Sequence, residues 1–283
     1  MAYDKPKPFI EVTVRNLSDT APHVACCAGF ERNSWRVEAL AEHLIEWLPE
    51  FALNAEEYSN ITGANARRAL RNAAKNIYTS TNYEKRGEIG EILLHAIIRQ
   101  EFNTEPLISK IYFKDSPNDT VKGFDSVHIV QTDKSVQLWL GEAKIYTSFN
   151  AAVYEINKSL KSHLVSDYLR LEFAAIVNKL EKTSPYFDIA KKLLDQNTSL
   201  DKIFECITIP VFVSYNSNAV KLSTASDKNY LDRLKNEILE KVTSLRTIKT
   251  DAATIKLIFI LFPMNTKSLL TTAFDKKLKG LAA

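Results

Sequence analysis

Three residues that could act together lie in the stretch GFDSVHIVQTDKSVQLWLGEAK, residues 123–144. Runs rich in Val, Ile, Leu and Trp flank the polar segment QTDKS, so this stretch is predicted to form a β-hairpin. If the turn is Thr132 to Ser135, Asp125 lies opposite Glu142 on the paired strand. Side chains alternate along a strand, so Lys144 shares the face of Glu142. Two carboxylates and an ammonium are therefore expected to meet at one end of an apolar hairpin.

Paired carboxylates of this kind suit Mg²⁺, a hard cation that prefers oxygen ligands, with Mn²⁺ as a possible substitute. Such a metal lowers the pKa of a bound water and neutralises charge on a phosphate oxygen. Lys144 could orient the attacking water or stabilise the transition state by its charge. The set therefore suits phosphodiester hydrolysis. A third carboxylate from a nearby helix would complete the metal site, and Glu91 is the first candidate, with Glu88 second. The alternative is a structural ion pair at a strand end.

The elements that must position these residues follow from hydrophobic periodicity. Residues 85–102 are predicted to form a helix whose apolar face is buried, with Glu88 and Glu91 on an adjacent side. Further predicted elements are a strand in 106–115, a helical region over 150–182, a short helix at 185–196, strands at 206–215 and 254–262, and an amphipathic helix at 228–245. The continuous apolar strands need cover on both faces, which predicts an α/β (α+β) fold with a mixed central sheet flanked by helices.

Residues 1–80 are predicted to form a distinct leading section, with a strand, a possible second strand and an amphipathic helix at 35–48 that ends before Pro49. A second helix, at 64–80, sets Arg67, Arg71 and Lys75 on one side with Arg68 beside them. This basic stripe could follow the phosphate backbone of a nucleic acid. It could equally be a solvated face, or one that pairs with acidic groups of a partner.

Composition narrows the possible classes. The 283 residues are 45% hydrophobic and 25% charged, as in an ordinary globular protein, and the net charge of +3 means that any nucleic-acid contact must come from local clusters of positive charge. The seven glycines form no phosphate-binding loop for ATP or a dinucleotide. With neither a signal region nor an apolar run of about 20 residues, the chain is expected to be cytoplasmic, without a membrane partner. Its three cysteines are expected to be free thiols.

The pattern G-F-D followed by G-E-A-K, after a helix that bears R-G-E-I-G-E, resembles the PD-(D/E)xK nuclease superfamily. In that resemblance Asp125 matches the first acid, Glu142 and Lys144 match the (D/E)xK, and Glu91 matches the helix acid. It implies a restriction-endonuclease-like αβββαβ core with an N-terminal extension. The sequence departs from the superfamily pattern in having Gly-Phe in place of Pro before Asp125.

The whole chain resembles the HamA family, the nuclease subunits of the Hachiman anti-phage defence system. This resemblance implies a nuclease domain at 81–283, an accessory or partner-docking region at 1–80, and a superfamily 2 helicase as partner. It implies Mg²⁺-dependent degradation of DNA, with unwinding left to the partner.

Other functions remain open at this point. The fold could have lost catalysis and serve to hold DNA or to regulate a helicase, although a degenerate site usually lacks one of its polar residues. Cleavage of RNA or tRNA would use the same chemistry, since nothing in the sequence reads a 2′-hydroxyl. A stand-alone, sequence-specific restriction enzyme is a further alternative, but no base-reading element is evident.

Overall fold

The computed structural model describes residues 5–78, 87–109, 123–131, 135–180, 182, 184–248, 250 and 254–282. Within these ranges, seven strands form one sheet in the order β1-β2-β9-β8-β7-β6-β5, and β3 pairs with β4 in a small separate ribbon. The strands of the large sheet are β1 (Glu11–Asn16), β2 (His23–Cys27), β5 (Glu105–Ser109), β6 (Ser126–Gln131), β7 (Val136–Ile145), β8 (Ile207–Asn216) and β9 (Lys256–Met264). The ribbon consists of β3 (Phe30–Glu31) and β4 (Ser34–Trp35).

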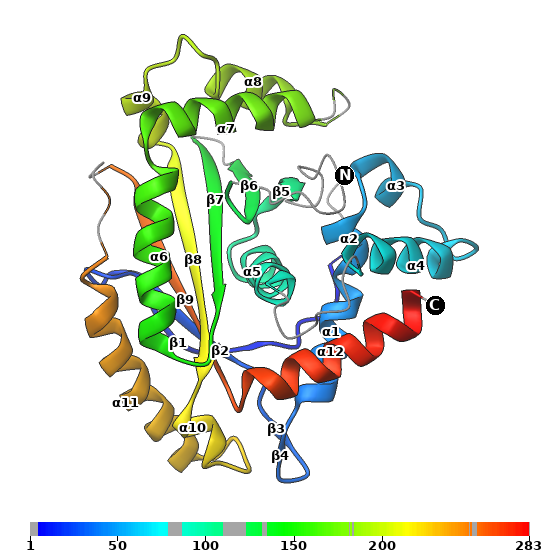
Figure 1. Cartoon of the computed structure of the whole chain (residues 1–283), viewed down its shortest axis with the longest axis vertical. Coiled ribbons are helices and arrows are strands. Elements are labelled where there is room, and N and C mark those ends of the chain that lie inside the picture. The colour runs from blue at the N-terminus through cyan, green and yellow to red at the C-terminus, as the bar shows by residue number, and fades with distance from the viewer. Residues whose placement is uncertain are drawn as a thin grey trace.

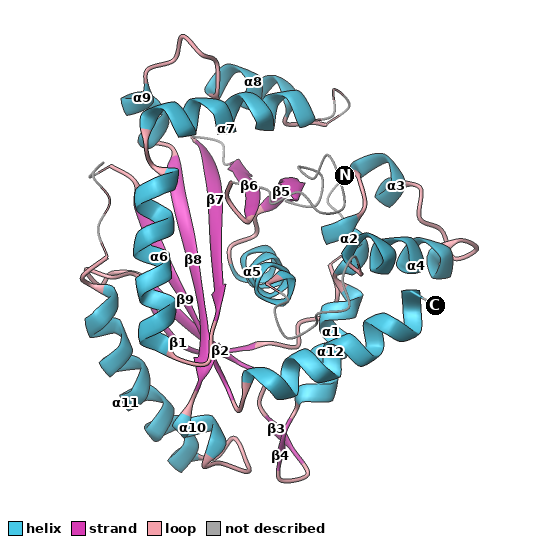
Figure 2. Ribbon diagram, viewed as in Figure 1, coloured by secondary structure: helices cyan, strands magenta, loops and turns pink. Residues whose placement is uncertain are grey.

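The central sheet is mixed, as predicted. Strands β2, β9, β8 and β7 run parallel, whereas β1 at one edge and β6 and β5 at the other pair antiparallel. Strand β8 is buried along its whole length except at Asn216, because it lies in the middle of the sheet with helices over both faces (Figure 2). The continuous apolar run that predicted a doubly covered strand is therefore confirmed.

The β6–β7 hairpin has the predicted register. Pairs run from Ser126 with Gly141 to Gln131 with Val136, and the Asp125 amide donates to the Gly141 carbonyl at 2.8 Å. Continuing this register sets Asp125 opposite Glu142. Residues 132–134 of the predicted turn lie outside the described residues, as does most of the strand predicted over 106–115 beyond Ser109.

The helices are α1 (Val37–Glu46), α2 (Leu48–Ala52), α3 (Ala55–Ser59), α4 (Ala66–Ile77), α5 (Glu88–Glu101), α6 (Phe149–His163), α7 (Ser166–Lys179), α8 (Phe187–Leu193), α9 (Leu200–Phe204), α10 (Asn218–Lys221), α11 (Lys228–Leu245) and α12 (Lys267–Ala282). Figure 1 shows α6 and α11 on one side of the central strands, α5 with the leading-section helices on the other, and α7 and α8 across one end. No helix in the described part of the chain is long and apolar enough to span a membrane.

The helices correct one prediction, and they include a long C-terminal helix that was not predicted. The region predicted as helical over 150–182 is two helices, because Val165 is extended (φ −66°, ψ 132°) and turns α7 away from the sheet. The C-terminal helix α12 was not predicted from the sequence. Its buried Leu270, Phe274 and Leu278 recur every four residues and pack it beside α1 and α4.

The leading section shares both its sheet and its core with the rest of the chain. Its strands β1 and β2 extend the central sheet beyond β9, and helix α1 ends before Pro49, as predicted. Buried side chains of α1 and α2 belong to the same hydrophobic cluster as those of α5 and β7. The division into two domains at residue 80 stays a prediction.

A buried ion network also joins α2 to α5. The Arg99 guanidinium contacts Glu50 (Nε to Oε1, 2.6 Å) and Glu105 (Nη1 to Oε1, 2.9 Å). His95 Nδ1 lies 3.1 Å from His128 Nε2, and both rings are buried. Both histidines therefore take part in packing and hydrogen bonding inside the core.

Candidate functional site

Asp125 lies just before β6 and is only 4% exposed. Its Oδ2 accepts a hydrogen bond from the Ala143 amide at 2.7 Å, so the carboxylate is held against β7. The preceding turn is fixed from α7, since the Phe124 amide donates to Glu172 Oε1 at 3.2 Å. A Cβ on Gly123, which has φ +155°, would lie 2.6 Å from that same oxygen. The positive φ therefore favours glycine at this position, and a larger residue would also displace the Glu172 carboxylate.

Glu142 is 1% exposed and is surrounded by donors. Its Oε1 accepts from Lys144 Nζ at 2.5 Å and from Ser159 Oγ of α6 at 2.7 Å. Its Oε2 lies 3.4 Å from His163 Nδ1 and has no hydrogen-bond partner among the described residues. The carboxylate thus has one oxygen held by two hydrogen bonds and one buried oxygen that faces His163.

The surroundings keep this buried carboxylate ionised. Burial by itself raises the pKa of Glu142, because the charged form loses water. The contact with His163, the charge and hydrogen bond of Lys144, and the Ser159 hydroxyl together outweigh burial and lower the pKa to about 2. Glu142 is therefore a ready anionic ligand at neutral pH.

Glu88 and Glu91 lie in the first turn of α5, which packs on the other face of β7. A Cβ on Gly90 would lie 3.5 Å from Ile145 and 3.7 Å from Ala143, so the first turn of α5 packs over these two side chains. Glu142 and Lys144 alternate with them and point to the α6 face. The structure thus brings Asp125, Glu142 and Lys144 to one face, whereas Glu91 and Glu88 lie on a helix over the opposite face. Their role in the site stays a prediction.

Within the described ranges, no group of three or more His, Cys, Asp and Glu is close enough to hold a metal ion. A pair of carboxylates still fits Mg²⁺, which usually keeps several waters and binds through one or two carboxylates plus substrate phosphates. Glu142, whose buried Oε2 faces only His163, and Asp125, at the position that continues the β6–β7 register, would be such a pair. The donor set therefore fits this metal without a third protein ligand.

Two residues at the site escaped sequence reasoning, namely Ser159 and His163. The His163 ring is largely enclosed. Its side chain is only 14% exposed, and its ring stacks on Tyr168 (centroids 5.1 Å apart, interplanar angle 7°) and meets the edge of Phe124. The sequence did contain a signal for both residues. They are four residues apart on α6, the helix that follows β7, so they lie on the same side of that helix, and this side covers β7.

The basic stripe of the leading section lies on other elements. Arg67, Arg68, Arg71 and Lys75 are all exposed on α4. Figure 1 shows α4 beside α3 and α12, with α5 between it and β7. These residues are thus not part of the cluster around Glu142.

Comparisons with known proteins cover nearly the whole chain. A family model described as HamA matches residues 7–278. Anti-bacteriophage protein A of Escherichia coli (strain K12) is 25% identical over 260 residues, which are 88% of this chain and 46% of that protein. The chain thus spans less than half the length of this curated relative. The matched residues include the strands and helices that build the site around Glu142. Because the family model covers almost all of the sequence, the chain belongs to the HamA family.

Proposed function

We propose that this chain is a metal-dependent DNA nuclease of the PD-(D/E)xK type that acts in anti-phage defence together with a superfamily 2 helicase. The observation that carries the proposal is the Glu142 carboxylate. It is buried and ionised, its Oε1 is paired with Lys144, and its strand is in register with Asp125.

The order of elements around the site supports the proposed nuclease class. Helix α5, the strands β5, β6 and β7, the helices beginning with α6, and strand β8 follow one another in the αβββαβ order that such a core needs. Strand β8 returns parallel to β7 on the side away from β6. Asp125 thus immediately precedes β6, and the Glu-x-Lys lies on the adjacent antiparallel strand β7.

Each residue has a distinct task in the proposed reaction. When bound, Mg²⁺ would supply an activated water and neutralise charge on the phosphate. Glu142 and Asp125 would hold the ion. Lys144, at 22% the most exposed of the three side chains, would orient the water or stabilise negative charge on the phosphodiester. Burial of the carboxylates strengthens these interactions because water is excluded.

The defence role is supported by family membership and by the name of the Escherichia coli relative, anti-bacteriophage protein A. A helicase partner is proposed from the resemblance described above. The near-complete burial of Asp125 and Glu142 supports a further expectation, that the isolated chain is restrained.

A substrate panel tests this function. Linear, nicked and supercoiled DNA and an RNA of matched length would be incubated with Mg²⁺ or with EDTA, with and without the helicase. We expect Mg²⁺-dependent loss of DNA that is strongest with the helicase present. If only RNA is cleaved, the substrate is RNA and the proposed DNA substrate is wrong. If no substrate is cleaved, the proposal is contradicted. Robust degradation by the chain alone at physiological salt would overturn only the restraint.

A further inference from the structure

Helix α4 carries an uncompensated row of positive charge. Its sequence ARRALRNAAKNI contains no acidic residue, and its four cations are exposed. Among the described residues, none of the four makes an ion pair. Exposed cations elsewhere do: Lys277 contacts Glu42 at 2.7 Å, and Arg246 contacts Asp19 at 3.0 Å. The α4 cations therefore remain available to an external anion.

The helix holds these charges in a fixed row. Arg67, Arg71 and Lys75 are four residues apart, so successive charges are displaced by about 6 Å along one side of the helix. A neighbouring side of the helix, with Ala73, Ala74 and Ile77, is buried. Contacts with α2 and α12 anchor it. The row is thus part of a packed element, which lowers the cost of presenting it to a long anion.

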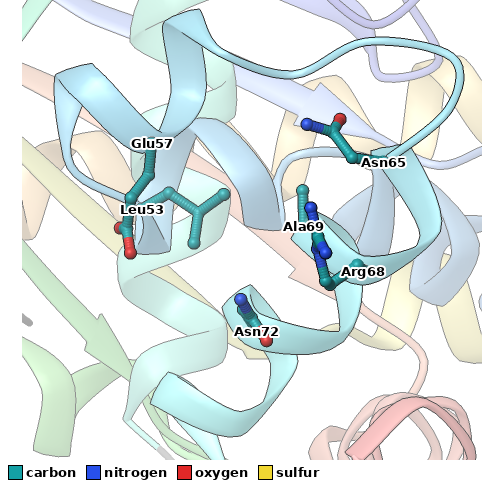
Figure 3. A pocket seen from close by; sticks show the side chains of 6 residues that line it. All are labelled: Leu53, Glu57, Asn65, Arg68, Ala69 and Asn72. Atoms are coloured by element: carbon teal, nitrogen blue, oxygen red, sulfur yellow. The ribbon is translucent and has the colours of Figure 1, made fainter.

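A hollow beside Arg68 does not suit a small anion. It has a volume of about 130 Å³ and is lined by Leu53, Glu57, Asn65, Arg68, Ala69 and Asn72 (Figure 3). The Glu57 carboxylate, which accepts from the Asn54 amide in the cap of α3, lines the same space and would repel a bound phosphate. The useful charge is therefore the exposed row rather than this hollow.

The exposed side of α4 also lacks the apolar anchors of a protein interface. No residue of α4 is among the exposed large hydrophobic side chains of the described chain. Protein–protein interfaces have apolar or aromatic centres, whereas DNA interfaces are more polar and much more positively charged. Three of the four cations are arginines, whose guanidinium groups bind phosphate in a bidentate manner. A nucleic-acid backbone fits this face better than an acidic protein.

We propose that Arg67, Arg68, Arg71 and Lys75 form a basic face on α4 that binds the phosphate backbone of the DNA substrate without reading its sequence. The inference rests on the proposed function, because it assigns the substrate that the nuclease would cut. It places a binding surface on an element separate from the cluster around Glu142.

The salt dependence of DNA binding tests this surface independently of cleavage. The full chain would be titrated against a mixed-sequence DNA duplex in EDTA over a range of salt concentrations. The test variant replaces all four cations by glutamine, which removes the charge and keeps a polar side chain of similar helix propensity. A control variant carries the same charge change at exposed lysines on other elements: Lys202→Gln, Lys221→Gln, Lys228→Gln and Lys235→Gln. Thermal unfolding checks that both variants fold.

Each phosphate contact contributes about 0.9 to the slope of log affinity against log salt concentration. We expect the α4 variant to lower the slope by about 3 to 4, and the control to change it by less than 1. Equal slopes in both variants, or no binding by the unchanged chain at low salt, would overturn the proposal. Loss of helicase association with unchanged DNA slopes would assign the face to an acidic partner instead. Cleavage assays in Mg²⁺ test the proposed nuclease activity separately, because a chain that binds DNA but cannot cut it would still show the change in slope.

Discussion

A buried carboxylate normally takes up a proton, because burial disfavours its charge. Glu142 keeps its charge since the His163 ring, the Lys144 ammonium and the Ser159 hydroxyl surround it. The shared face of Glu142 and Lys144, and the position of Asp125 opposite Glu142, could be predicted from strand alternation and register alone. The contribution of α6 could not, because the position of a helix over a strand depends on the loop that joins them.

The low pKa of Glu142 predicts a pH dependence of stability. Its folded pKa of about 2 lies below its ordinary value of 4.5, so the ionised group stabilises the fold above pH 4.5. This contribution is lost as pH falls toward 2. Compared with Glu142→Gln, the unfolding free energy of the natural chain should fall more steeply below pH 4.5, by up to about 1.4 kcal/mol per pH unit. Urea unfolding at pH 6, 4.5 and 3.5 measures the difference. A constant difference would show that Glu142 has an ordinary pKa.

Ser159 is predicted to hold Glu142 in position for the metal. Removal of a hydrogen-bond partner of a metal-ligating side chain typically costs 10- to 100-fold in metal affinity or activity. For Ser159→Ala we expect the Mg²⁺ concentration at half-maximal cleavage to rise about tenfold, with most of the rate recovered at saturating Mg²⁺. Ser162→Ala, an exposed serine on the same helix, is the matched control and should behave like the natural chain. If the two variants behave alike, the contact between Ser159 and Glu142 has no functional role.

Among the elements, the β6–β7 hairpin was predictable in detail because apolar runs and a polar turn define its register. The burial of β8 and the helical face of α11 followed from the same periodicities. Several helical features were missed, among them the short helices α2, α3, α9 and α10. The break between α6 and α7 has no proline or glycine to mark it, and α12 has a lysine-rich end that masks its four-residue apolar repeat.

Close packing of the hairpin against α5 predicts that Gly141 cannot be replaced. A Cβ at this position would lie 2.2 Å from Ser126 Oγ and 2.7 Å from Leu94 Cδ2. Gly141→Ala should therefore destabilise the fold by about 1 to 3 kcal/mol through overpacking. Gly63→Ala, where no atom lies within 4 Å, should change stability by less than about 0.5 kcal/mol. Chemical denaturation compares the two, and equal stabilities would contradict the close approach of β6, β7 and α5.

At the scale of the whole molecule, the leading section was predicted as a separate region from its position before a polar tract. In the structure, its strands β1 and β2 belong to the common sheet, and its α2 is joined to α5 through a buried ion network. Sequence could not reveal this, since β2 pairs with β9, more than 200 residues later in the chain. The contact between Glu50 and Arg99 is likewise long-range.

This integration predicts that Glu50 stabilises the whole chain. Glu50→Gln removes the carboxylate at Arg99 Nε and leaves this buried guanidinium with Glu105 alone, so it should lower the unfolding free energy by roughly 3 kcal/mol. Glu42→Gln breaks a surface pair with Lys277 and should cost less than about 1 kcal/mol. Urea unfolding followed by tryptophan fluorescence and circular dichroism should show one coincident transition. Two separate transitions, with only the first shifted by Glu50→Gln, would show that the leading section folds independently.

The most direct test of the proposed site is the rate of Mg²⁺-dependent DNA cleavage by Glu142→Gln, measured in single turnover with and without the helicase. Glutamine keeps the shape of the side chain but removes the charge that would hold the metal. Glu240→Gln on the exposed side of α11 is the matched control. We predict a loss of roughly 1,000-fold for Glu142→Gln and an unchanged rate for Glu240→Gln. Cleavage by Glu142→Gln at the rate of the natural chain would contradict the assignment of this carboxylate as the centre of a nuclease site.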